Sequence, residues 1–87
     1  MSRARRVKRT DLNQPAIVKA LRDISGVTVQ LDVDDILVGY KGRTYWFEIK
    51  ESPKSNIQPS QINLTENWKG HYKIVWSLDM ILADMGI

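Results

Sequence analysis

The stretch DDILVGYKGRTYWFEIK, residues 34–50, constrains the fold more than any other part of the sequence. Two apolar runs, residues 35–40 and 43–50, flank Lys41-Gly42, and glycine readily adopts the positive φ of a tight hairpin turn. The pattern predicts a β-hairpin. With a loop of two or four residues, Asp35 faces Glu48 and Ile36 faces Phe47.

This register separates the apolar from the polar side chains, because successive residues of a strand point to opposite faces. A three-residue loop with a bulge would mix the two sets, so we expect an even loop. One face then collects Ile36, Val38, Tyr45, Phe47 and Ile49, and the other collects Asp35, Gly39, Thr44, Glu48 and Lys50.

The polar face brings two carboxylates and an ammonium together at the end of the hairpin. Opposed side chains have Cβ atoms about 4.5–5.5 Å apart, and two carboxylates at that distance repel unless a cation or a shared proton joins them. Mg²⁺ keeps several waters, so Asp35, Glu48 and the backbone carbonyl of Ile49 suffice to hold it. Lys50 could then orient a metal-activated water or stabilise a phosphate under attack. A solvated surface pair of Glu48 and Lys50 is the alternative.

The remaining segments predict three helices and two further strands, in the overall order α-β-β-β-α-β-α. The first helix has Asp11 or Asn13 as its cap, Pro15 in its first turn and Gly26 after its end. We expect the other elements at residues 27–33 (strand), 59–69 (helix, followed by Gly70), 71–77 (strand) and 78–85 (helix, capped by Ser77).

Eighty-seven residues make one small domain, and the absence of cysteine excludes disulfides, thiol nucleophiles and Cys-ligated zinc. No apolar run approaches the roughly 18 residues of a membrane span, and we expect no signal peptide and a cytoplasmic protein. Residues 1–10 are expected to form a flexible basic arm ahead of a single domain at residues 11–87. Nucleic-acid phosphates are the candidate partner of its five basic residues, which are Arg3, Arg5, Arg6, Lys8 and Arg9.

At these motifs the sequence resembles the PD-(D/E)xK nuclease superfamily, whose core has the order αβββαβ. More narrowly it is similar to the small stand-alone VRR-NUC proteins encoded by phages. The resemblance covers residues 10–87 and rests on NQPAIVKALRDISG, DDILVGYKGRTYWFEIK, QPSQINLTENWKG and VWSLDMILADMG. It implies a restriction-endonuclease-like α/β fold, with a mixed sheet flanked by helices, and the cytoplasm of a phage's host cell as the location.

The resemblance also implies site residues. The motif aspartate falls on Asp35, the Glu-x-Lys on Glu48 and Lys50, and a helix glutamine on Gln61. The implied metal is Mg²⁺ or Mn²⁺, and the implied activity is cleavage of DNA, including branched DNA, by a homodimer.

The chain departs from the family pattern at two points. Asp34 stands where the family has proline, and it either adds a ligand or is a turn residue. Many members supply a glutamate from the first helix, where this chain offers Asn13 and Gln14, with Asp11 nearby.

Several other residues carry weaker expectations. Gln61 shares a helix face with Leu64 and Trp68, and it either meets a metal-bound water or phosphate or stays in solvent. Trp46, Trp68 and Trp76 are expected in the core, and His71 is expected to be structural or exposed.

Two functions remain open from the sequence. A metal-dependent DNA endonuclease that prefers branched, Holliday-junction-like DNA explains the opposed carboxylates. A non-catalytic nucleic-acid-binding domain that retains the nuclease fold is the alternative, favoured by the weak acidity of the first helix.

Overall fold

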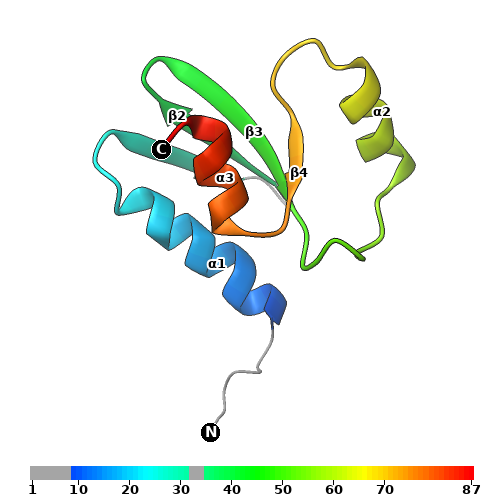
Figure 1. Cartoon of the computed structure of the whole chain (residues 1–87), viewed down its shortest axis with the longest axis horizontal. Helices are drawn as coiled ribbons and strands as arrows, with labels where there is room; N and C mark the ends of the chain where they lie inside the picture. Colours follow the sequence, from blue (N-terminus) through cyan, green and yellow to red (C-terminus); the bar gives the residue numbers. More distant parts are fainter. Residues whose placement is uncertain (1–8, 32–34) are drawn as a thin grey trace, which may run out of the picture.

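The computed structural model describes the backbone of residues 9–31 and 35–87, and the side chains of residues 14–31 and 35–87. The chain is an α/β protein with a four-stranded mixed sheet and helices packed around it (Figure 1). Its elements are α1 (Arg9–Arg22), β1 (Val27–Leu31), β2 (Asp35–Tyr40), β3 (Arg43–Ile49), α2 (Pro59–Asn67), β4 (Lys73–Val75) and α3 (Leu78–Met85).

The sheet has the strand order β1-β2-β3-β4. The first three strands are antiparallel neighbours, and β4 returns parallel to β3 after the crossover through α2. The expected order of elements, α-β-β-β-α-β-α, is therefore confirmed.

The hairpin of β2 and β3 has the expected register. Asp35 pairs with Glu48 and Ile36 pairs with Phe47, and Tyr40 pairs with Arg43 across a two-residue loop. Lys41 and Gly42 both have positive φ, 53° and 78°, which is the turn geometry that matches the twist of the strands.

One face of the sheet forms the hydrophobic core with α1 and α3; in Figure 1, α3 crosses in front of the strands and α1 runs below them. Ile36, Val38 and Phe47 are fully buried there, together with Leu21 of α1 and Ile81 of α3. The expected apolar face of the hairpin is thus the core face, and burial of its side chains fixes the register. α2 lies to the side, beyond β4, and has no buried residue.

The first helix begins earlier than expected. It starts at Arg9, so Asp11 and Asn13 occupy helical positions and are not its cap, and Arg9 and Thr10 belong to the helix rather than to an arm. Pro15 lies well inside the helix instead of in its first turn. Proline has no backbone N–H, so inside a helix it loses one hydrogen bond to the preceding turn. A helix that begins closer to Pro15 was therefore the simpler prediction.

Two other elements also differ from the expectation. α2 ends at Asn67, where Trp68 leaves the helix in an extended conformation, so Gly70 lies beyond its end. β4 is only three residues long. The end of the first strand expected at residues 32–33 lies outside the described residues.

The last helix matches the prediction at both ends. The Ser77 hydroxyl accepts the backbone N–H of Met80 at 3.2 Å, and Gly86 closes the helix in the left-handed conformation. No helix in the described part of the chain is long and apolar enough to cross a membrane.

Candidate metal-binding site

The second face of the sheet carries the polar end of the hairpin. Asp35 is the first residue of β2 and Glu48 lies beside it in β3, so the two carboxylates project from neighbouring strands on the same side. Lys50 follows Glu48 by two residues, and its backbone N–H donates to the carbonyl of Val75 at 2.8 Å. This bond extends the ladder past the end of β3 and aligns Lys50 with Glu48.

Glu48 is the one charged residue among the buried residues that the structure describes, with 4% of its surface exposed. Its Oε2 lies 3.8 Å from Nζ of Lys50, whose side chain is also largely covered. Burying a carboxylate is unfavourable unless a positive charge accompanies it, and Lys50 supplies that charge. The solvated surface pair that the sequence left open is therefore wrong.

Asp35 is held by a tryptophan. Trp46 lies on the same face, and its indole Nε1–H donates to Oδ2 of Asp35 at 2.8 Å. This bond fixes the orientation of the carboxylate, and a carboxylate so held can still bind a metal through its other oxygen. The ring of Trp46 also meets Tyr72 and Trp68 edge to face, at centroid distances of 4.9 and 5.6 Å.

Tyr72 comes just before β4 and lies on the same face of the sheet as Ile74, which pairs with Glu48. Its hydroxyl is buried and has no hydrogen-bond partner among the described residues. Burial, followed by the negative charges of Glu48 and Asp35, raises the pKa of Tyr72 from 10.0 to about 12. The phenol therefore stays protonated at neutral pH and remains a hydrogen-bond donor beside the carboxylates.

The ligands available to a divalent cation are few. No group of three or more His, Asp and Glu side chains that could hold a metal occurs among the described residues. Asp35, Glu48 and the backbone of Ile49 remain, and the Ile49 side chain packs on the core at the opposite face. Two carboxylates and a carbonyl fit Mg²⁺ or Mn²⁺, because these ions retain several waters.

Gln61 has a structural role. Its Oε1 accepts the backbone N–H of Gln58 at 3.0 Å and so caps the N-terminus of α2. Gln61 and Leu64 are the two residues of α2 that are not exposed, so the predicted stripe is the more covered side of the helix, although none of its residues is buried. The side-chain amide nitrogen of Gln61 is the group that remains for a ligand.

Gln14 lies elsewhere. It lines a cavity of about 440 Å³ between α1 and β1, together with Arg22 and Leu31, and none of the three hairpin residues Asp35, Glu48 and Lys50 lines this cavity. Arg3, Arg5, Arg6, Lys8 and Asp34 lie outside the described residues, and only the backbone is described for Arg9, Asp11 and Asn13.

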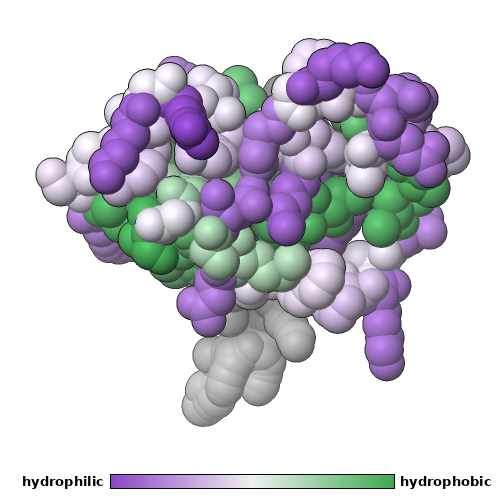
Figure 2. Space-filling model, turned by 45° about the horizontal axis from the view of Figure 1, so that its top comes forward, coloured by the Kyte–Doolittle hydropathy of each residue, from purple (hydrophilic) through white to green (hydrophobic). Residues whose placement is uncertain are grey.

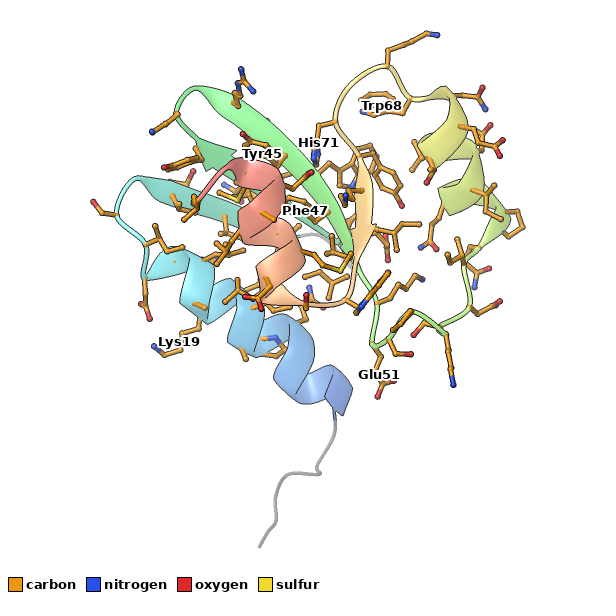
Figure 3. The ribbon with its side chains drawn as sticks, in the orientation of Figure 1. Lys19, Tyr45, Phe47, Glu51, Trp68 and His71 are labelled. Carbon is orange, nitrogen blue, oxygen red and sulfur yellow. The ribbon has the colours of Figure 1, made fainter. Side chains whose placement is uncertain are left out.

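The tryptophans were placed wrongly from the sequence. Trp68 is 51% exposed and Trp76 is also exposed, whereas Trp46 is half-buried on the second face rather than in the core. Trp68 lies in the loop before β4 (Figure 3), with its Nε1 only 2.8 Å from the position that a Cβ on Gly70 would occupy.

His71 is structural, which was one of the two alternatives expected from the sequence. Its Nδ1 accepts the backbone N–H of Trp46 at 3.0 Å, and its Nε2 bonds to Asp84 of α3. The ring packs edge to face on Tyr45 and Phe47, and Figure 3 shows the three side chains close together. His71 thus joins the start of β4 to β3 and to α3.

Sequence reasoning gave no site role to Trp46 or Tyr72. The alternation of residues in β4 puts Tyr72 on one face with Ile74, and that was the available signal. Which face β4 presents depends on its parallel pairing with β3, which no local pattern specifies. Searches against protein-family profiles, curated proteins and solved structures give no match to this chain.

Proposed function

We propose that this chain is a metal-dependent DNA endonuclease with a restriction-endonuclease-like fold of the VRR-NUC type. The observation that carries the proposal is the pairing of Asp35 with the buried Glu48, with Lys50 Nζ 3.8 Å from Glu48 Oε2. Lys50 offsets one of the two negative charges of this pair, and a divalent cation would offset the remaining one, which favours a metal site over a purely structural role.

The chain's own residues have distinct parts in this proposal. Asp35, Glu48 and the Ile49 carbonyl hold Mg²⁺ or Mn²⁺, and the ion when bound supplies Lewis acidity for hydrolysis of a phosphodiester bond. Lys50 places a positive charge beside the phosphate, where charge develops during attack. Trp46 holds Asp35 in one orientation through the 2.8 Å bond from its indole.

The proposal also has a substrate half, in which the chain acts as a homodimer that cuts branched DNA. One copy of the hairpin presents one carboxylate pair, and symmetric resolution of a four-way junction requires two cuts. A two-fold dimer supplies two sites related by the symmetry of the junction. Arg3, Arg5, Arg6, Lys8 and Arg9 would add affinity for phosphates without sequence preference.

A non-catalytic nucleic-acid-binding domain is the second candidate. It is favoured by the bond between Trp46 and Asp35, which engages one carboxylate oxygen, and by the small number of acidic ligands in the described part of the chain.

Incubation with supercoiled plasmid and with a four-way junction separates the two candidates. The nuclease nicks or cuts both substrates with Mg²⁺ or Mn²⁺, prefers the junction, is inhibited by EDTA, and loses activity in the Glu48→Gln variant. Retarded migration of intact DNA with every metal would identify the binder. Equal cutting of junction and linear duplex would contradict only the substrate half.

A further inference from the structure

The hydroxyl of Tyr72 is a buried polar group that the proposed roles do not use. Its oxygen is buried and has no hydrogen-bond partner among the described residues. A buried hydroxyl without a partner is unfavourable, so such groups are rare unless something else satisfies them.

The position of Tyr72 connects this hydroxyl with the carboxylate pair. The Tyr72 ring contacts Trp46 edge to face at 4.9 Å, and Trp46 donates its indole N–H to Asp35. The charges of Glu48 and Asp35 are felt at the hydroxyl, yet neither carboxylate lies within hydrogen-bond distance of it. The hydroxyl is therefore a donor beside two carboxylates that accept no bond from it, and an oxygen atom of a ligand held by these carboxylates would supply the acceptor.

Tyr72 as a whole is half-buried, and its hydroxyl is the buried end of the side chain. The helix α2, which crosses from β3 to β4, buries no side chain.

We infer that the Tyr72 hydroxyl donates a hydrogen bond to an oxygen atom of the ligand bound at the Asp35–Glu48 pair. This inference rests on the proposed function and extends the site by a residue next to the last strand. The oxygen belongs either to a non-bridging position of the bound phosphate or to a water carried in by the metal ion, and the phosphate oxygen is the stronger acceptor because it is anionic.

Replacing Tyr72 by phenylalanine removes the hydroxyl and keeps the ring against Trp46. The matched control is Tyr40→Phe, which makes the same chemical change at the turn end of the hairpin, away from the carboxylates. Because no described residue offers the Tyr72 hydroxyl an acceptor, Tyr72→Phe should leave the melting temperature unchanged or raise it.

Binding is measured without turnover, with Ca²⁺ in place of Mg²⁺, first for the ion alone and then for a four-way junction. Loss of one hydrogen bond predicts an affinity roughly threefold to tenfold weaker for Tyr72→Phe and unchanged for Tyr40→Phe. A loss already present with Ca²⁺ alone assigns the oxygen to a water on the ion, and a loss seen only with DNA assigns it to the phosphate.

Single-turnover cleavage with Mg²⁺ completes the test, and Tyr72→Phe should be slower than wild type by about tenfold. If wild type cleaves and Tyr72→Phe matches it in cleavage and in both affinities, the inference is wrong although the proposed function stands. A lower melting temperature with unchanged affinities would also overturn it, because the hydroxyl would then bond within the free protein. A wild type that cleaves no DNA contradicts the proposed function instead, and the Ca²⁺ affinities still decide on Tyr72.

Discussion

Two neighbouring residue pairs of one hairpin lie on opposite faces of the sheet. Ile36 and Phe47 are fully buried beneath α1 and α3, whereas Asp35 and Glu48, the adjacent pair, project from the other face of the sheet. A shift of one residue would exchange the two faces and expose the core. Burial of the apolar face therefore fixes the register that pairs the polar residues. The two faces can be tested separately, because we expect substitutions on the apolar face to change stability and those on the polar face to change the proposed activity.

The surface of the molecule carries both hydrophilic and apolar residues. Hydrophilic residues cover the two upper lobes in Figure 2, and apolar residues show beneath them as a band. The exposed apolar residues include Leu37 of the second face, which is 42% exposed in the same strand that buries Ile36 and Val38 completely.

The largest effect is expected for Phe47→Ala on the core face. Phe47 is fully buried and stacks on Tyr45 at 6.1 Å, so its truncation should lower the free energy of unfolding by about 3–5 kcal/mol. Leu37→Ala, on the second face of the neighbouring strand, is the control and should cost less than about 1 kcal/mol. Urea denaturation measures both, and similar losses would contradict the division between the two faces.

The next effect is expected for the carboxylates, in activity rather than in stability. Asp35→Asn or Glu48→Gln removes the charge of a proposed metal ligand worth several kcal/mol, so the single-turnover rate should fall by roughly a thousandfold. Without metal, the stability of Asp35→Asn should be equal or higher, because the repulsion between like charges is gone. Glu48→Gln also removes the partner of Lys50, so its metal-free stability should be lower than that of Asp35→Asn. A clear loss of stability in metal-free Asp35→Asn would mean that this carboxylate serves the fold.

Lys50→Ala should reduce the cleavage rate by roughly a hundredfold, on the scale of removing one donor to a developing charge. Binding of DNA in Ca²⁺ should survive, and Lys50→Arg should restore little, because a planar guanidinium cannot replace a compact ammonium. Lys19→Ala, at an exposed pair with Asp23 on α1, is the matched control. Equal losses of binding and cleavage in Lys50→Ala would make this lysine a phosphate anchor and favour the binder.

A smaller and local effect is expected for Gly70→Ala. A Cβ at this position would lie 2.8 Å from Trp68 Nε1, and the exposed indole can move away. Stability should change by about 1 kcal/mol or less, while the tryptophan fluorescence and near-ultraviolet circular dichroism change as Trp68 leaves Trp46. Lys69→Ala should change neither signal, and an unaltered spectrum in Gly70→Ala would show that the two rings are not in contact.

The smallest effect is expected at the N-terminus. Removing residues 1–8 deletes Arg3, Arg5, Arg6 and Lys8 ahead of α1. The slope of log affinity for DNA against log salt concentration should flatten by about one unit for each phosphate that these residues neutralise, with the cleavage rate of bound DNA unchanged. An unchanged slope would show that these residues do not bind DNA.

The two faces also differ in how far the sequence predicts them. The hairpin, its register and the pairing of Asp35 with Glu48 follow from local alternation and from a turn that needs glycine, so they could be derived from residues 34–50. The helix α3, which ends at Gly86, could also be predicted from the sequence, because its cap and stop signals are local.

The surroundings of the carboxylates depend on contacts between distant segments. Trp46 meets Tyr72 and Trp68 only because β4 adds to β3 in parallel, and hydrophobicity alone suggested the core for all three tryptophans. Gln61 pointed to a ligand from the sequence, but its nearest partner is the backbone at the start of its own helix. The start of α1 was predicted too late in the sequence, because proline favours the first turn of a helix. The helix instead contains Pro15 in its interior.

Binding of Mn²⁺ to the DNA-free protein, measured by isothermal titration calorimetry, tests the central claim most directly. The account predicts that wild type and the Lys19→Ala control bind the ion alike, and that Asp35→Asn and Glu48→Gln each lose this binding while remaining folded. Equal binding of Mn²⁺ by wild type and by both carboxylate variants, or no binding by wild type at all, would contradict the claim that the paired carboxylates form a metal site.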